Sequence, residues 1–155
     1  MKIYVLSDSH NSIMFSSFLE KAQEADMVIH CGDGTRDQED LKSVLSCPVY
    51  CVKGNCDFSG KREEIIEVAG HRIFVTHGDI YNVKNTYSGL VVRAKELGAD
   101  IVLYGHTHVP DISYQDNIWV INPGSLTRPR DNKVPTYCIL ELDGEKVNAR
   151  LIKYN

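Results

Sequence analysis

"VLYGHTHVP", residues 102–110, joins an apolar run to Gly105 and to two histidines that flank Thr107. In extended backbone, residues two apart point to the same side of the chain, whereas in a helix such a pair would diverge. We therefore expect His106 and His108 to face one target at the end of a buried strand.

Further apolar runs without polar alternation predict strands that are buried on both faces. These runs are 2–7, 27–31, 48–53 and 72–76, and 101–104 is the fifth. Between the runs, apolar residues recur at helical spacing over 14–25 and 83–97, and a third, shorter helix is expected around Leu41, Val44 and Leu45. This alternation is typical of an α/β protein.

The helical period ends after residue 110. Residues 111–116, 118–124, 136–143 and 146–154 look like antiparallel strands, with Asp143-Gly144 as a hairpin turn. Residues 63–69 form another expected hairpin with the run at 72–76. No linker or repeat interrupts the pattern, so we expect residues 1–155 to form one domain.

Each of the five buried runs is followed by polar side chains that can bind a metal. In an open α/β sheet the carboxyl ends of the strands share one edge, so these groups should converge on one crevice. Seven nitrogen or oxygen ligands are more than one ion normally takes, which suggests two ions that share a carboxylate. The seven are Asp8, His10, Asp33, Asn55, His77, His106 and His108.

The ligand types narrow the choice of metal. Carboxylate and amide oxygens mixed with imidazoles suit Mn, Fe, Ni, Co or Zn, and the affinity order alone does not name the occupant. We expect two divalent ions, with Mn²⁺ as the first choice and Ni²⁺, Fe²⁺ or Zn²⁺ as alternatives. Two ions about 3.5–4 Å apart can bridge a hydroxide and hold a phosphoryl group, as in phosphoesterases.

Five motifs in this order resemble those of the calcineurin-like metallophosphoesterase superfamily. They are Asp-x-His at 8–10, Gly-Asp at 32–33, Gly-Asn-x-Asp at 54–57, His-Gly-Asp at 77–79 and Gly-His-Thr-His at 105–108. The short chain with Gly-Asn-Cys-Asp resembles the small bacterial and archaeal phosphodiesterase branch, and the resemblance extends to "NPGSLTRPR" at 122–130. It implies a two-sheet β-sandwich flanked by helices, a four-layer αββα fold.

The resemblance also implies how the ligands are shared. Asp8, His10, Asp33 and His108 would hold one metal, and Asp33, Asn55, His77 and His106 the other, with Asp33 as the bridge. We expect Asp33, Asn55 and His77 to take part in catalysis as well as in metal binding. The implied function is a phosphodiesterase that hydrolyses small phosphodiesters through a metal-bridging hydroxide.

Two other functions are open to a chain of this kind. A retromer subunit of the same fold works as a protein-binding scaffold with an altered metal site, whereas all seven ligand positions are intact here. A nucleotide-cofactor site is disfavoured, because "SDSHNS" at 7–12 lacks the G-x-G-x-x-G loop. The intact ligand set favours the enzyme over the scaffold.

One position departs from the superfamily pattern. Much of the superfamily has a histidine near the leaving group where this chain has Cys56. A thiol with an ordinary pKa of about 8.5 is a weaker donor than an imidazolium and carries no positive charge. Cys56 is therefore either a poor substitute for a general acid or a packed small residue.

The remaining polar residues have ordinary structural explanations as well. We expect His30, inside a strand, and His71, at a hairpin turn, to be hydrogen-bonded structural histidines. Asp57 and Asp79 either orient ligands or form turns. Three further residues, Asn122, Ser125 and Arg128, either line the substrate end of the crevice or belong to a turn at Pro123-Gly124, and we favour the turn.

Composition limits the partners. With 17 basic and 21 acidic residues and no Lys/Arg cluster, the chain is not expected to bind extended nucleic acid, although a small phosphate ester remains a suitable substrate. No apolar run resembles a signal sequence or a membrane span, and five cysteines suggest reduced thiols, so we expect a cytoplasmic protein without a membrane partner. Extended strands near the C-terminus could pair with those of a second copy in a homo-oligomer.

Overall fold

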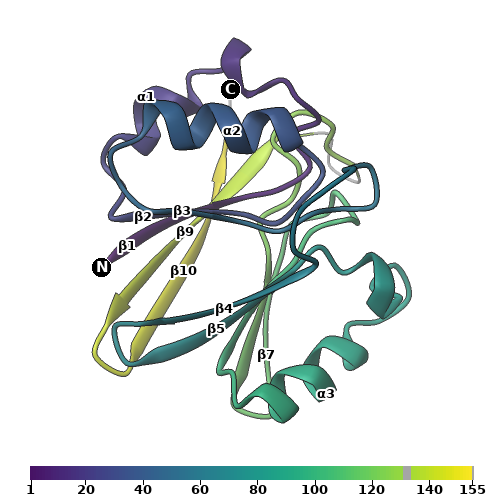
Figure 1. The fold of residues 1–155 in the computed structure, drawn as a ribbon. Coiled ribbons are helices and arrows are strands. Elements are labelled where there is room, and N and C mark those ends of the chain that lie inside the picture. Colours follow the sequence, from purple (N-terminus) through teal and green to yellow (C-terminus); the bar gives the residue numbers. More distant parts are fainter. Residues whose placement is uncertain (131–133, 155) are drawn as a thin grey trace.

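Two five-stranded β-sheets form the centre of the structure, a computed structural model that describes residues 1–130 and 134–154 (Figure 1). The first sheet contains β1 (Lys2–Leu6), β2 (Met27–His30), β3 (Val49–Cys51), β9 (Thr136–Asp143) and β10 (Lys146–Lys153). The second contains β4 (Glu63–Val68), β5 (His71–Thr76), β6 (Ile101–Leu103), β7 (Asp111–Gln115) and β8 (Ile118–Asn122). Their strand orders are β10-β9-β1-β2-β3 and β4-β5-β6-β8-β7.

Helices cover the outer face of each sheet (Figure 1). The first sheet packs against α1 (Phe18–Ala22) and α2 (Thr35–Val44), and the second against α3 (Ser88–Leu97). Two short 3₁₀ helices, η1 (Ile13–Phe15) and η2 (Asp79–Tyr81), lie in the connections. The predicted four-layer αββα sandwich is confirmed.

The period-2 alternation of strand side chains explains why the central strands are apolar throughout. In β1, Ile3 and Val5 pack between the two sheets, whereas Tyr4 and Leu6 pack against the helices. Burying one such aliphatic side chain contributes about 1.5–3 kcal/mol, so both faces stabilise the sandwich. A strand covered on both faces needs no polar side chains, as the run at 2–7 predicted.

The strands that carry the motifs belong to two sheets rather than one. β1, β2 and β3 run parallel in the first sheet, and β5, β6 and β8 run parallel in the second. The expectation of a shared carboxyl edge therefore holds within each sheet. The ligand-bearing loops from the two edges meet, which brings residues from both halves of the sandwich together.

The predicted helix over 14–25 is wrong in its extent. The chain forms η1 and then α1, because Ser16 is extended and its Oγ donates to the carbonyl of Ile13 at 2.6 Å. A serine hydroxyl that satisfies a backbone carbonyl competes with helical hydrogen bonds. The helix expected over 83–97 begins only at Ser88, after Asn82 in the left-handed region, whereas the helix around Leu41 extends over all of α2.

The predicted C-terminal hairpins and thiols agree with the structure. β9 and β10 pair across the turn at Asp143-Gly144, and β4 and β5 pair across the turn at Ala69-Gly70. All five cysteines are unpaired. Within residues 1–130 and 134–154, no helix combines the length and the apolar character needed to cross a bilayer.

His71 ties the second sheet to the β9–β10 hairpin, which confirms its structural role. Its Nδ1 lies 2.6 Å from Asp100 Oδ2 and its Nε2 lies 2.7 Å from the carbonyl oxygen of Gly144. Both partners accept hydrogen bonds, so both are satisfied only by an imidazolium. Burial lowers the pKa of His71, but the hydrogen bonds to Asp100 and Gly144 outweigh it and raise the pKa above its ordinary value.

The raised pKa of His71 predicts a pH-dependent contribution to stability. A histidine whose pKa is raised in the folded state stabilises the fold fully when the pH is below its unfolded-state pKa of about 6.5. This contribution is lost as the pH rises through the folded-state pKa. We expect His71→Gln to lower the free energy of unfolding by about 1 kcal/mol at pH 5.5, and by less at pH 8.5. Urea unfolding of both proteins across this range measures the difference; a difference that grows with pH would contradict the assignment.

Candidate metal centre

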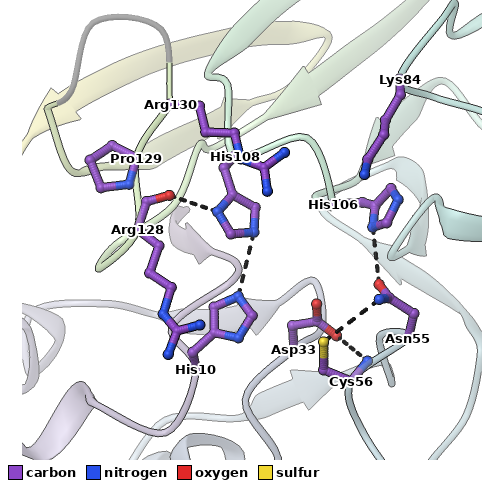
Figure 2. A pocket seen from close by; sticks show the side chains of 10 residues that line it. All are labelled: His10, Asp33, Asn55, Cys56, Lys84, His106, His108, Arg128, Pro129 and Arg130. Atoms are coloured by element: carbon purple, nitrogen blue, oxygen red, sulfur yellow. Dashed lines mark hydrogen bonds between the residues drawn. The ribbon is translucent and has the colours of Figure 1, made fainter.

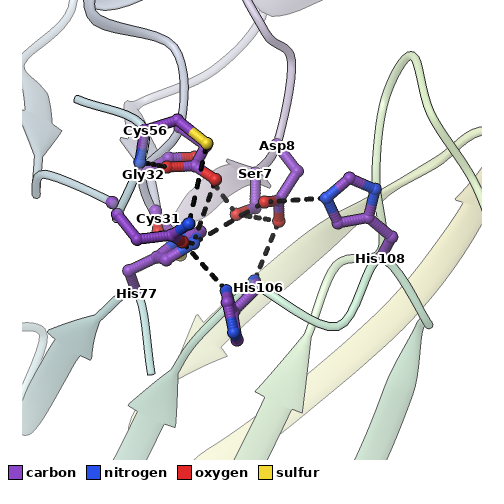
Figure 3. A network of polar contacts seen from close by, with 12 residues as sticks. Ser7, Asp8, Cys31, Gly32, Cys56, His77, His106 and His108 are labelled. Carbon is purple, nitrogen blue, oxygen red and sulfur yellow. Dashed lines mark hydrogen bonds and ion pairs between the residues drawn. The ribbon is translucent and has the colours of Figure 1, made fainter. Parts of the chain in front are cut away.

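The loops that follow five strands bring the seven predicted side chains to one place (Figures 2 and 3). Asp8 and His10 follow β1, Asp33 follows β2 and Asn55 follows β3. From the second sheet, His77 follows β5, and His106 and His108 follow β6. Residues up to 100 positions apart in sequence thus face one crevice, as predicted.

One group of side chains is formed by Asp8, His10 and His108. The Nε2 atom of His108 lies 3.2 Å from Asp8 Oδ1 and 3.4 Å from the Nε2 atom of His10. One donor atom from each of the three residues lies within 4.8 Å of the others. These are three of the four ligands predicted for the first ion.

A second group surrounds His77. Its Nε2 atom lies 3.3 Å from Asp33 Oδ2, 3.8 Å from Asp8 Oδ1 and 3.0 Å from Asn55 Oδ1. Nδ1 of His106 lies 3.0 Å from the same Asn55 oxygen. One donor atom each of Asp33, His10 and Cys56 also lies within 4.8 Å of the others, so Asp33 lies close to members of both groups.

The carboxylate of Asp8 suits a cation. Its Oδ2 accepts hydrogen bonds from Ser7 Oγ at 2.7 Å and from the N–H of His106 at 3.0 Å (Figure 3). Its Oδ1 is buried and has no hydrogen bond of acceptable geometry within the described residues, although His108 Nε2 is near. A buried anionic oxygen without a donor is costly unless a cation satisfies it. The residues present therefore fit a divalent metal.

The backbone at the ligands is mostly left-handed. Asp8, His10, Asp33, His106 and His108 all have φ between 48° and 71°. Non-glycine residues pay of order 1 kcal/mol or more for this region, and such strain concentrates at functional sites.

The extended backbone expected at His106 and His108 is wrong, because φ is 71° at His106 and 60° at His108, although both side chains line the same cavity. The two side chains consequently diverge, and His106 faces Asn55 while His108 faces His10 (Figure 2). This geometry favours one histidine for each ion.

Hydrogen bonds behind the histidines fix which nitrogen faces the crevice. Nδ1 of His77 donates to the carbonyl of Cys31 at 2.8 Å, and Nδ1 of His108 donates to the carbonyl of Arg128 at 2.6 Å. Each Nε2 is then free to bind a metal, the arrangement usual for metal-binding histidines. His30 is a structural histidine as predicted, since its Nδ1 accepts from the N–H of Gly32 and its Nε2 contacts Ser9 Oγ.

Asp57 orients the loop that carries Asp33. Its carboxylate accepts hydrogen bonds from the N–H groups of Asp33, Gly34, Thr35 and Gly54 at 2.8–3.0 Å. A Cβ at Gly54 would collide with the Asp33 carboxylate, so glycine is required there. Asp79, by contrast, begins η2 and lies 3.6 Å from Arg62.

The segment 122–130 supports the site. Ser125 Oγ donates to the carbonyl of Asp8 at 2.8 Å, and Asn122 Nδ2 donates to the carbonyl of Gly105 at 3.1 Å. Both are fully buried, so they brace the ligand loops and do not line the crevice. Arg128 does line it, and there the favoured turn interpretation is incomplete.

The electrostatics keep both carboxylates ionised. Burial would raise the pKa of Asp8, but the close contact with His108 and the charge of His77 hold that pKa below its ordinary value. Burial would also raise the pKa of Asp33, but the hydrogen bond from His77 and the charge of His77 hold that pKa far below the usual range. Two anionic carboxylates among four imidazoles are thus available to cations at neutral pH.

The cavity over these groups has a volume of about 380 Å³ (Figure 2). Cys56 lines it and is exposed, so the alternative of a packed small residue is wrong. Burial, followed by the charge of Asp33, raises the pKa of the Cys56 thiol, which keeps it protonated. Three further lining residues are not singled out by the sequence: Lys84 lies outside every motif, and Pro129 and Arg130 end the segment 122–130, which the sequence predicts as a turn.

The sequence model of the calcineurin-like phosphoesterase superfamily domain matches residues 1–145. The chain belongs to this superfamily. It is 38% identical to "Probable metallophosphoesterase YsnB" of Bacillus subtilis over 154 residues, which cover 97% of this chain and 89% of that protein. It is also 27% identical to phosphodiesterase YfcE of Escherichia coli over 106 residues, 61% of this chain and 53% of that protein.

Solved structures agree with this family. A conserved Streptococcus pneumoniae protein described as a predicted phosphoesterase superposes with a TM-score of 0.85 at 30% identity, over 98% of this chain and 88% of that one. Vps29 of Entamoeba histolytica in complex with zinc gives a TM-score of 0.80 at 23% identity, with both chains covered completely. The Vps29 similarity shows a shared fold only.

Proposed function

We propose that this member of the metallophosphoesterase superfamily is a phosphodiesterase that hydrolyses small phosphodiesters with two divalent ions, of which Mn²⁺ is the first candidate. The observation that carries the proposal is the pair of ligand groups that meet at Asp33. The YfcE relative, which is named a phosphodiesterase, supports the diester specificity.

The proposed ligands of one ion are Asp8, His10, Asp33 and His108, and those of the other are Asp33, Asn55, His77 and His106. When bound, two divalent ions at such a site supply Lewis-acid activation of the phosphoryl group and a nucleophile at neutral pH. The chain itself fixes the donors: Asp57 holds the Asp33 loop, and Cys31 and Arg128 orient the histidines. This preorganisation lowers the cost of assembling the charged transition state.

The alternative is a protein-interaction scaffold like the retromer subunit. The buried Oδ1 of Asp8 makes no hydrogen bond of acceptable geometry within the described part of the chain, which is costly in a protein that never binds a cation. We therefore favour catalysis.

The test is to strip the purified protein with a chelator, load it with Mn²⁺, Ni²⁺, Fe²⁺ or Zn²⁺, and measure hydrolysis of bis(p-nitrophenyl) phosphate and p-nitrophenyl phosphate. We expect faster hydrolysis of the diester, and a loaded protein without any turnover would support the scaffold.

The thiol of Cys56 predicts that the rate of hydrolysis depends steeply on the pKa of the leaving group. A protonated thiol donates weakly, and general acid catalysis is worth about 10²- to 10⁴-fold in rate, so alkyl diesters should react far more slowly than nitrophenyl diesters. Cys56→Ala should change turnover of bis(p-nitrophenyl) phosphate little, whereas Cys56→His should accelerate alkyl esters selectively. Steady-state rates over a series of leaving groups measure both effects.

An outcome of the opposite kind would revise the role of Cys56. If Cys56→Ala retains its metals but loses about 1,000-fold in rate on the activated diester, the thiol is itself a catalytic group. Metal content, measured on the same sample, separates this result from loss of an ion.

A further inference from the structure

Three cationic side chains surround the mouth of the cavity. Lys84 comes from the loop after η2, and Arg128 and Arg130 come from the loop after β8 (Figure 2). Each lies beside a different histidine of the site: Lys84 beside His106, Arg128 beside His10 and Arg130 beside His108. The cations therefore approach the site from several sides.

Within the described residues, these three cationic side chains have no carboxylate partner, as is also true of exposed basic residues such as Arg36 and Lys146; what sets the three apart is that all of them line one cavity. Arg62, Arg72 and Arg93 each lie within 4.0 Å of a carboxylate, in pairs with Asp79, Glu67 and Glu63. Within residues 1–130 and 134–154, no carboxylate forms an ion pair with Lys84, Arg128 or Arg130. Three unpaired cations at one cavity repel one another unless an anion neutralises them.

The three cationic side chains are not metal ligands, because a positively charged side chain repels a metal cation. A single diester phosphate carries one negative charge, which the two proposed metal ions would already bind. The formal net charge of the chain is −4, so this local excess of positive charge runs against the overall balance. A recognition role for a further anionic group explains it, since arginine binds phosphate through paired N–H donors.

We propose that the substrate is a small phosphodiester that carries a second phosphate group, which Arg128, Arg130 and Lys84 bind while the diester lies at the metal centre. This inference rests on the proposed function and names its substrate class. The footprint of three cations suits a small ligand, because a nucleic-acid polymer is held by contacts to many phosphates. The three are specificity residues rather than metal ligands.

The first test compares two chromogenic diesters: the p-nitrophenyl ester of thymidine 5′-phosphate, and the same ester with a 3′-phosphate. We expect the enzyme loaded with Mn²⁺ to prefer the second by about tenfold or more in kcat/KM, mainly through KM, as one charged phosphate contact provides. Arg128→Gln and Arg130→Gln should each reduce this preference severalfold. Arg150→Gln is the matched control, because Arg150 lies on β10 and pairs with Glu141.

The second test measures binding without turnover. Calorimetry with chelator-treated protein compares thymidine 3′,5′-bisphosphate with thymidine 5′-phosphate. We expect a lower Kd for the bisphosphate, a preference that shrinks in the two arginine variants and at high salt. Because both arginines are exposed, these substitutions should leave the fold intact, which circular dichroism checks.

The outcomes separate the two proposals. Equal kcat/KM and equal Kd values for the ligands with and without the extra phosphate would overturn the substrate class and leave the phosphodiesterase standing. A wild-type preference that both arginine variants retain would overturn the assignment to these residues. If the metal-loaded enzyme releases nitrophenol from neither ester, the proposed phosphodiesterase activity is contradicted, and the substrate class with it. The calorimetric Kd values would still show whether the arginines bind phosphate.

Discussion

Asp33→Asn should lower kcat/KM for bis(p-nitrophenyl) phosphate by at least about 1,000-fold, because stabilisation of transition-state charge by the metals is worth several kcal/mol. The side chain lies between the two ligand groups, with Oδ2 3.3 Å from His77 Nε2 and Oδ1 accepting the N–H of Cys56. The amide keeps the shape but removes the charge and one anionic oxygen. We therefore expect both ions to be weakened together, as metal analysis of the dialysed variant would show.

The control for this substitution is Asp143→Asn, which removes an exposed carboxylate at the β9–β10 turn. It should retain two metals and full activity. If Asp33→Asn also binds two ions and turns over normally, Asp33 is not a bridge and the ligand assignment fails.

The two histidines of the Gly-His-Thr-His motif should have separable effects. His108 lies among Asp8 and His10, whereas His106 contacts Asn55 beside His77. We expect His108→Ala and His106→Ala each to lower the affinity for one ion by at least about 10- to 100-fold. The two substitutions should affect different ions. Crystals of each variant soaked in Mn²⁺ would show which site is depleted.

His71→Gln serves as the matched histidine control, because His71 lies at the β4–β5 turn and contacts Asp100 and Gly144. It should retain density for both ions. Depletion of the same ion in His106→Ala and His108→Ala would contradict the division of ligands between two metals.

Much of the fold follows from the sequence because a strand covered on both faces must be apolar throughout. That rule located β1, β2, β5 and β6 and the ligand that follows each strand. It did not reveal that β1 and β5 belong to different sheets, since an isolated apolar run carries no information about its partner strand. The family resemblance supplied that part of the architecture.

Local backbone geometry was harder to predict. His106 and His108 were expected on extended backbone, but both adopt left-handed conformations that tertiary contacts hold in place. Ser16 ended a helix whose apolar period was intact, because a hydroxyl competes for the backbone carbonyl of Ile13. The apolar period of a sequence indicates which residues are buried, but it does not indicate such hydrogen bonds.

The rim of the cavity shows a different limit. Lys84 and Arg130 lie in segments that look like solvated surface in the sequence, and only the folded chain places them beside His106 and His108. Arg128 was identified, but the role of its carbonyl as acceptor for His108 Nδ1 was not, since a backbone group carries no sequence signature. The predicted ligands lie in sequence motifs, whereas only the tertiary structure brings the three cations together at the cavity.

Metal content and diester hydrolysis, measured on one preparation, test most directly whether the chain forms a dinuclear catalytic centre. The protein is stripped with a chelator and titrated with Mn²⁺ while bound metal per chain and turnover of bis(p-nitrophenyl) phosphate are followed. We expect two ions to bind per chain and activity to appear as the second site fills. Full occupancy at one ion, or hydrolysis that persists in the stripped protein, would contradict this expectation.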